Sequence, residues 1–576
     1  MRFSAVFRAW SGALALAGVL AFQASAFQMS IARAADDDEV VLAEDRLPPG
    51  VLLYVTSPDV VAAYEQFQKT SASALINDPS LEKFRAQLLE RYAEFQKEAE
   101  DKLKLPLADL FALFSGEISM AVVRPVGQPL GWVAFMDIGE HEETLDALLL
   151  KAEEAFDGEK IAKETETIAE TEVVTCTVTT SDAEDAQPVT VAYFVKDGMF
   201  VFGSDAEVLE SVLTRWDGEH EETFAANEIY QEIVAKCVTN EDSEPSLIWY
   251  VDPVGLVASG LSMAPQTQNF AGMIYMPTLG LTGLKAFGGV QELATEQFDH
   301  VSRMLIYIDG PPTGVVKVFE LRPSEVTAPT WVPADAGQYF ALDWNIKGAY
   351  ESIEAIYDSF LGPGKFAMAT ANLTKQAGVD LKLKADVIDV LSGKVQGYYS
   401  ASAAAPEDFT GVISVGVTDP AKGQKLVDTV FQLAGGAKSA DFEGTKIYEP
   451  ANDTGKGVAA VKGNAIMISS TGETLKLALA ARPANPLAAT PEYKSVAKVI
   501  PKEVCLFSYQ NAAGQFADVY EKARSGEFDG LVEGKLDFSV LPPFEEIRKY
   551  FGPNGAYYIP DESGAIGVQF SPKRTK

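Results

Sequence analysis

The stretch VKDGMFVFGSDAEVLESVL at Val195–Leu213 has a counterpart, VKGNAIMISSTGETLKLAL, at Val461–Leu479. The two stretches align without a gap. Each has the pattern of an apolar strand, a short turn and an amphipathic helix. The recurrence indicates that the chain contains two copies of one architecture, although it says nothing about what that architecture does.

The start of the helix in each copy carries the same signal. Ser204 is followed three residues later by Glu207, and Ser470 is followed three residues later by Glu473. In a capping box, the serine side chain accepts a hydrogen bond from a free amide of the first turn, and the glutamate reaches back to the amide of the serine. The spacing therefore predicts a capping box at both helix starts.

Four further pairs of segments repeat in the same order along the chain. They are Leu52–Glu65 with Gln338–Glu351, LFSGEI from Leu113 with VLSGKV from Val390, VAFMDIGEHEE from Val133 with VISVGVTDPAK from Val412, and SLIWYVDP from Ser246 with VCLFSYQN from Val504. Because the order never breaks, internal duplication is the best interpretation. Each half begins with a split βαβ pattern, and its strand pairs resemble hairpins. We therefore expect an α+β fold with two tandem, internally duplicated lobes of mostly antiparallel sheet and helices packed on one face.

Composition and pattern along the chain also predict the domain boundaries. A signal peptide covers residues 1–35 and an acidic, mobile leader covers 36–46. The first lobe is expected at 47–322 and the second at 333–576, with a proline-containing linker at 323–332 between them. Residues 159–172 are polar and acidic without an apolar period, so a loop is predicted there.

The N-terminus has the pattern of an export signal. Arg2 and Arg8 precede an apolar run, and small residues at 24–26 or at 32–34 suit cleavage near residue 26 or 35. The apolar run is short for a membrane span of about 20 residues. We therefore expect an exported protein, periplasmic or extracellular, whose membrane contact would come only through an uncleaved signal anchor, if at all.

The charge of the chain limits the kinds of molecule that it can be expected to bind. The chain has 47 lysines and arginines against 82 aspartates and glutamates, which gives a formal charge of −35. Such a field repels nucleic acid, so no nucleic-acid partner is expected. The expected partner is an unknown ligand or protein of the bacterial envelope.

The cysteines do not form a disulfide framework. Cys176, Cys237 and Cys505 lie far apart and contain no CxxC spacing. The patterns around Cys176 and Cys237 are typical of small core residues. One long-range disulfide stays open as an alternative, because an exported protein meets oxidants.

A repeated hexapeptide, GEHEET, offers the clearest candidate for a metal site. It places His141 and His220, two of the three histidines, beside glutamates. One imidazole and carboxylates from each copy could bind a metal. The favoured alternative is a pair of helix starts, since acids in the first turn suit the helix dipole and the zincin spacing of histidines is missing. No metal or cofactor is therefore predicted.

Recognisable catalytic motifs are missing from the sequence. GPGKF at Gly362–Phe366 lacks the Ser or Thr and the glycine spacing of a phosphate-binding loop. No GxSxG elbow occurs, and three histidines leave few candidates for a nucleophile and base pair. A hydrolase that uses two carboxylates stays open, because the separation of carboxylates is a three-dimensional fact.

Several longer segments resemble an uncharacterised family of secreted bacterial proteins, a domain of unknown function. The segments are LPPGVLLYVTSPD from Leu47, LGLTGLKAFGG from Leu279, VPADAGQYFALDW from Val332 and GVDLKLKADVIDVLSGKV from Gly378. They are packing and turn patterns, so the resemblance implies export and a two-copy layout, and no activity or site residue.

Two functions are compatible with these observations. The first is a non-enzymatic binding or scaffolding protein of the bacterial envelope, with a ligand in the groove between two similar lobes. The alternative is a carboxylate-dependent hydrolase, for example one that acts on glycans, which requires two close acids with one raised pKa. The first is favoured because no catalytic set can be assembled from the sequence.

Overall fold

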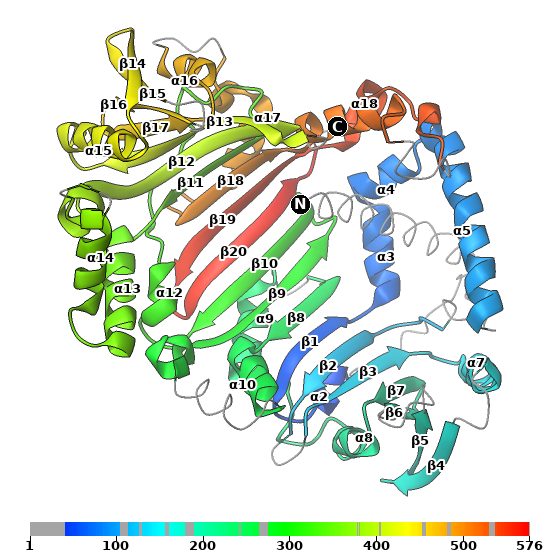
Figure 1. Cartoon of the computed structure of the whole chain (residues 1–576). Helices are drawn as coiled ribbons and strands as arrows, with labels where there is room; N and C mark the ends of the chain where they lie inside the picture. Colours follow the sequence, from blue (N-terminus) through cyan, green and yellow to red (C-terminus); the bar gives the residue numbers. More distant parts are fainter. Residues whose placement is uncertain are drawn as a thin grey trace. The chain divides into compact units, whose positions relative to one another are not determined.

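The computed structural model describes residues 41–574 apart from short gaps (Figure 1). The gaps are residues 104–112, 126–128, 156–160, 179–188, 241–242, 264–274, 377, 380, 403–404, 452–456, 481–484 and 529–535. The predicted signal peptide therefore lies outside the described residues. No helix in the described part of the chain combines the length and the apolar character that a membrane crossing needs.

The chain divides into two compact units, which are described separately. Unit 1 comprises Met1–Ser259, Ala286–Thr295 and Ala523–Pro543. Unit 2 comprises Gly260–Lys285, Glu296–Lys522 and Phe544–Lys576. The unit boundary therefore does not fall at the predicted linker.

The sheet of unit 1 is antiparallel throughout the order β9-β8-β1-β2-β3-β7-β6-β5-β4. Its strands are β1 (Val51–Ser57), β2 (Ile118–Val123), β3 (Gly131–Asp137), β4 (Ile161–Ile168), β5 (Thr171–Val178), β6 (Val189–Lys196), β7 (Met199–Gly203), β8 (Leu247–Val251) and β9 (Leu284–Leu293).

The sheet of unit 2 is antiparallel throughout the order β10-β20-β19-β18-β11-β12-β13-β17-β16-β15-β14. Its strands are β10 (Phe298–Ile308), β11 (Gln338–Asp343), β12 (Leu391–Ser402), β13 (Ala405–Val417), β14 (Ala437–Phe442), β15 (Thr445–Pro450), β16 (Val458–Lys462), β17 (Ala465–Ser469), β18 (Leu506–Asn511), β19 (Pro553–Asp561) and β20 (Gly564–Pro572).

The two orders correspond strand for strand. Adding ten to each strand number of unit 1 gives β19-β18-β11-β12-β13-β17-β16-β15-β14, which is the unit 2 order from β19 onward. The helices accompany these strands, so the described chain is α+β with antiparallel sheets. The helices are α2 (Ala43–Arg46), α3 (Val60–Gln68), α4 (Ser71–Ile76), α5 (Glu82–Leu103), α7 (Glu142–Ala155), α8 (Ala206–Leu213), α9 (Glu228–Cys237), α10 (Pro253–Met263), α12 (Gly314–Val318), α13 (Ile346–Leu361), α14 (Lys365–Gln376), α15 (Pro420–Leu433), α16 (Gly472–Leu479), α17 (Pro491–Ala497), α18 (Ala512–Arg524) and α19 (Phe544–Ile547).

The stretch at 195–213 forms the β6–β7 hairpin and α8. Lys196 pairs with Met199 across a two-residue turn, Asp197-Gly198, in which both residues have positive φ angles of 50° and 72°. This backbone is the type I′ turn that matches the twist of a hairpin, and Asp-Gly is among its preferred sequences. Buried and half-buried residues alternate along β7, so one face of the strand packs in the core.

The helix caps fall one residue later than the sequence predicts. Asp205 is the N-cap of α8, and its carboxylate accepts from the amide three residues on at 2.9 Å. The Ser204 hydroxyl instead accepts from the Trp132 amide of β3 at 3.3 Å. Thr471 caps α16 in the same way as Asp205 caps α8. The predicted capping boxes of Ser204 with Glu207 and of Ser470 with Glu473 are therefore wrong, because aspartate and threonine are also strong caps.

Helices pack on both faces of the unit 2 sheet. Successive residues of a strand point to opposite faces. On β17, Ile466 belongs to the core cluster that contains Phe431 of α15. Its neighbour Met467 belongs to the cluster that contains Leu475 of α16. The expectation that helices cover one face alone is therefore wrong for this unit.

Residues 159–172 contain a strand where the sequence predicts a loop. Strand β4 pairs with β5 along its whole length, and residues 162–167 are exposed. The strand lies at the end of the unit 1 order, where charged residues are common. Because successive residues 162–167 are all exposed, neither face of this stretch packs in a core, which accounts for the missing apolar period.

The predicted leader and linker are both packed. In the leader, residues 36–40 lie outside the described residues, but Ala43 of α2 is 0% exposed and Arg46 is 8% exposed. In the segment 323–332, Ala328 and Val332 belong to the main core cluster of unit 2. The Ala328 amide also donates to the Tyr493 hydroxyl at 2.9 Å. Composition alone predicts mobility in both places, whereas the few apolar residues of each segment anchor it.

Candidate functional site

A hollow of about 340 Å³ lies at one end of strands β12, β13 and β17 in unit 2. We call it the unit 2 hollow. It is lined by Ser392, Lys394, Gln396, Ser414, Gly416, Val417, Asn464 and Ala465. Since these residues come from strands and their turns, the site is held by the sheet itself.

The hollow exists because β13 and its neighbour β17 carry the small residues Ser414, Gly416 and Ala465 beside β12. Gln396 of β12 pairs with Ser414 of β13, and Gly416 of β13 pairs with Ala465 of β17. Gly416 also allows β12 to come close, since a Cβ atom at this position would lie 2.3 Å from the Ser392 hydroxyl. Larger side chains at these positions would fill the space.

The corresponding strands of unit 1 carry those larger side chains. Ser119 of β2 pairs with Phe135 of β3, and Asp137 of β3 pairs with Met199 of β7. Phe135 is 1% exposed and Met199 is 8% exposed. The place that is hollow in unit 2 is therefore packed in unit 1.

The polar groups around the unit 2 hollow suit hydrogen bonding to a ligand. The carbonyl oxygen of the Gln396 side chain accepts from the buried Tyr339 hydroxyl at 3.2 Å. This contact orients the side chain and leaves its NH₂ group as the donor end. The Ser392 hydroxyl accepts from the Lys394 amide at 3.3 Å, and the Lys394 side chain is exposed.

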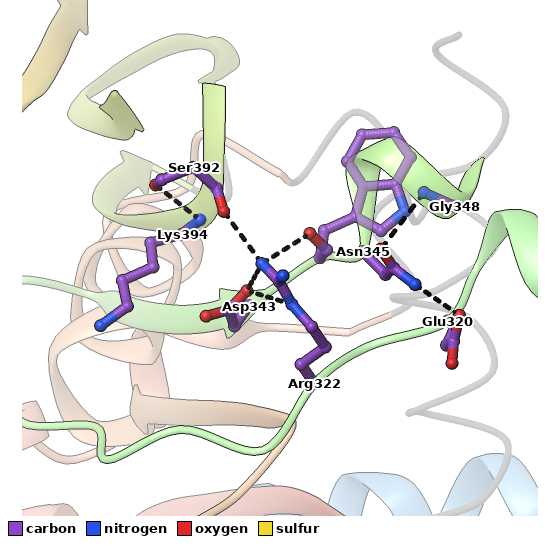
Figure 2. Close-up of polar contacts among 8 residues, drawn as sticks. Glu320, Arg322, Asp343, Asn345, Gly348, Ser392 and Lys394 are labelled. Atoms are coloured by element: carbon purple, nitrogen blue, oxygen red, sulfur yellow. Dashed lines mark hydrogen bonds and ion pairs between the residues drawn. The ribbon is translucent and has the colours of Figure 1, made fainter. Parts of the chain in front are cut away.

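An arginine–aspartate pair holds the strand that carries Ser392 and Lys394. Figure 2 shows the Arg322 side chain between Asp343 and the main chain of Ser392. Its Nε donates to Asp343 Oδ1 at 3.0 Å, and its Nη2 donates to the Ser392 carbonyl at 2.9 Å. Asp343 of β11 pairs with Lys394 of β12 across the strands. Gly393 has a φ of 97°, and a Cβ atom there would lie 2.2 Å from the Trp344 carbonyl, so glycine is required for this close approach.

The start of α13 is fixed beside this pair. The Asn345 side chain accepts from the Gly348 amide at 3.2 Å as the N-cap and donates to Glu320 at 2.6 Å (Figure 2). The Trp344 indole donates to the Val318 carbonyl at 2.7 Å. These contacts anchor the segment that carries Arg322, so the pair beside the hollow is held from two sides.

Unit 1 has a buried carboxylate at the position that corresponds to Lys394. The segments LFSGEI and VLSGKV align Glu117 with Lys394 and, two residues further on, Ser119 with Gln396. Glu117 is 4% exposed. It accepts from the Ala43 amide at 3.0 Å and from the Thr56 hydroxyl at 3.3 Å, and Ser119 donates to it as well. Burial raises the pKa of Glu117.

Helix α2 closes this carboxylate off from solvent. The Arg46 guanidinium lies 3.9 Å from the centre of the Trp216 ring, and the Trp216 indole donates to Asp197 at 2.7 Å. Glu44 accepts from the hydroxyls of Tyr230 and Tyr54, the latter at 3.5 Å. Burial raises the pKa of Glu44 to about 7, against the lowering effect of its bond to Tyr230. The arrangement anchors the N-terminal segment to unit 1.

The residues that the sequence singles out do not form a site. His141 precedes α7, and its carbonyl accepts from the Leu145 amide at 3.1 Å. The imidazole of His220 accepts from the Glu222 amide at 3.0 Å. Within the described residues, no group of three or more His, Cys, Asp or Glu side chains could hold a metal ion. Local turns thus account for both GEHEET histidines.

The three cysteines form no disulfide in this structure. Cys237 is 0% exposed and Cys505 is 6% exposed, so both are core residues. Cys176 lies on β5, opposite Val191 of β6, and is half-buried. The structure therefore does not contain the one long-range disulfide that the sequence leaves open.

The comparisons with known proteins found no counterpart. No protein-family model, no curated protein and no solved structure matches this chain.

Proposed function

We propose that the protein is exported and binds a small molecule in the unit 2 hollow without transforming it. The observation that carries the proposal is a hollow at the end of three paired strands, whose lining includes two serines, Gln396, Asn464 and Lys394 among small and apolar residues. Its volume of about 340 Å³ is at the lower end of the range of about 300–1,000 Å³ that is usual for ligand sites. Export to the periplasm or beyond is supported by the signal pattern at the N-terminus.

We further propose that the two units arose by internal duplication and that binding belongs to one of them. The common strand order and the five repeated segment pairs support the duplication. Phe135 and Met199 fill the place in unit 1, whereas Ser414 and Ala465 leave it open in unit 2. On this proposal, unit 1 has a structural role and unit 2 provides the binding site.

The test compares the wild-type protein with a variant whose hollow is filled. Ser414→Phe places the unit 1 side chain at the corresponding position of unit 2. The wild-type protein, purified from the exported fraction and measured by native mass spectrometry, should carry a small-molecule adduct that Ser414→Phe lacks. Ser439→Phe on the exposed strand β14 is the matched control and should keep the adduct. Equal adducts on the wild type and Ser414→Phe would contradict the proposal.

The carboxylate hydrolase has one observation in its favour. Glu44 and Glu117 are neighbouring acids, both with a pKa raised mainly by burial, and the Glu117 charge raises the pKa of Glu44 further as a secondary effect. However, neither residue lines the unit 2 hollow, and Glu117 is held by two hydroxyls and a backbone amide. This geometry favours an anchor for α2 over a catalytic pair. Hydrolysis of a chromogenic glycoside that is lost in Glu117→Gln would reverse that preference.

A further inference from the structure

We propose that the ligand of the unit 2 hollow is a small hydroxylated carboxylate, of which a uronic acid is the simplest example. The inference rests on the proposed binding function and adds the chemical class of the ligand.

The charge of the lining is opposite to that of the chain. Acids outnumber bases by 82 to 47 in the whole sequence, yet the eight residues that line the hollow include one lysine and no acid. The nearest acid across the strands is Asp343, and the Arg322 guanidinium binds its carboxylate directly. The Lys394 ammonium is therefore the lining group whose charge can select a ligand, and it selects an anion.

The corresponding position in unit 1 shows how such a place accommodates a carboxylate. There the carboxylate is supplied by the chain itself, as Glu117, and hydroxyl groups of Thr56 and Ser119 donate to it. In unit 2 this side chain is replaced by Lys394, and Gln396 replaces Ser119. The anion is thus removed from the chain and a cation is added, and Ala341 stands opposite Gln396 where Thr56 stands opposite Ser119, so that the Gln396 amide remains as the donor of this strand pair. An external carboxylate restores the pairing.

The remaining lining groups indicate hydroxyls on the ligand. Ser392, Ser414, Gln396 and Asn464 carry hydroxyl and amide groups, which both donate and accept. A purely apolar acid would offer these groups no hydrogen bonds in exchange for the water that it displaces, which costs free energy. A hydroxylated acid of monosaccharide size satisfies them and fits the volume.

The experiment uses isothermal titration calorimetry on the mature protein with D-glucuronate and D-glucose. The two sugars differ at one carbon, which is a carboxylate in the first and a hydroxymethyl group in the second. We expect D-glucuronate to bind at least about tenfold more tightly than D-glucose, since a charge-assisted hydrogen bond replaces a neutral one. Inorganic phosphate serves as a second anion and should bind more weakly than D-glucuronate.

Variants locate the effect. Lys394→Met should weaken D-glucuronate binding about tenfold or more and leave D-glucose unchanged. Lys438→Met, at an exposed lysine of β14, should leave both unchanged. Since Lys394 is exposed, its variant should fold, and circular dichroism checks this. Equal binding of the two sugars, no binding of either, tighter binding of phosphate, or an unaffected Lys394→Met would overturn the inference. A small-molecule adduct that Ser414→Phe lacks would still support the binding function in each of these cases.

Discussion

Replacing Glu44 by glutamine should remove a large part of the pH dependence of the stability of unit 1. Glu44 lies on α2, accepts from the hydroxyls of Tyr230 and Tyr54, and is desolvated by its burial. Glutamine keeps the shape and an acceptor oxygen but cannot ionise. The substitution therefore isolates the cost of placing a charge at this position.

The size and sign follow from the raised pKa. Burial moves the pKa of Glu44 from 4.5 to about 7, so the folded state binds its proton more tightly than the unfolded state does. The stabilisation is fully present below pH 4.5 and is lost as the pH rises through about 7. The difference of 7 − 4.5 in pKa corresponds to about 3 kcal/mol of unfolding free energy across this window. The wild-type protein should lose this amount, and Glu44→Gln should not.

Urea unfolding at a series of pH values from 4 to 8, followed by tryptophan fluorescence, measures the effect. The quantity of interest is the difference in pH dependence between the two proteins, since other groups such as Glu117 titrate in both. Glu207→Gln, at an exposed glutamate of α8, is the matched control and should behave like the wild type. If the wild type and Glu44→Gln differ by less than about 1 kcal/mol across the window, the account of Glu44 as a buried acid is refuted.

Three further predictions concern packing and caps. Asp205→Ala removes the N-cap of α8 and should lower the protection of its first-turn amides in hydrogen exchange by about 1 kcal/mol, and unchanged protection would reject Asp205 as the cap. Leu209→Ala at a fully buried position should cost about 2–5 kcal/mol in urea unfolding, whereas Leu477→Ala, 67% exposed, should stay within about 0.5 kcal/mol; similar losses in both would argue against the assigned core. Asp343→Ala should lower the free energy of unfolding by about 1–3 kcal/mol, because it removes the acceptor of Arg322. An unchanged free energy of unfolding would show that the ion pair does not stabilise this strand.

Much of the succession of strands and helices along the chain was accessible from the sequence because apolar alternation is strong in this chain. The stretch at 195–213 predicts a hairpin and a helix, and both are present as β6, β7 and α8. Asp59 stands directly before α3 and caps it, since its carboxylate accepts from the Val61 amide at 2.9 Å. These features depend on residues close together in sequence, so local pattern suffices.

The features that the sequence misses depend on distant partners. Strand β4 has no apolar face because residues 162–167 are exposed on both faces, and its place at the edge follows from the pairing of the whole sheet. The sequence of helix α2 resembles a charged tail. The helix is held in place because Glu117, which is 74 residues away, accepts from its first amide, that of Ala43. The cap at Asp205 rather than Ser204 depends on the β3 amide that occupies the serine. Composition cannot supply partners of this kind.

The unit 2 hollow also depends on residues that are distant in sequence, which is why the candidate site was not predicted. The exchange of Glu117 for Lys394 and of Phe135 for Ser414 can be seen when the repeated segments are aligned. Each exchange alone is ordinary variation in a strand. Only the pairing of β12, β13 and β17 places the small residues side by side, so that their missing volume adds up to a hollow with a cation at its edge. On the proposed duplication, the chain keeps its fold through the apolar positions that both units share and acquires a site through the facing positions where they differ.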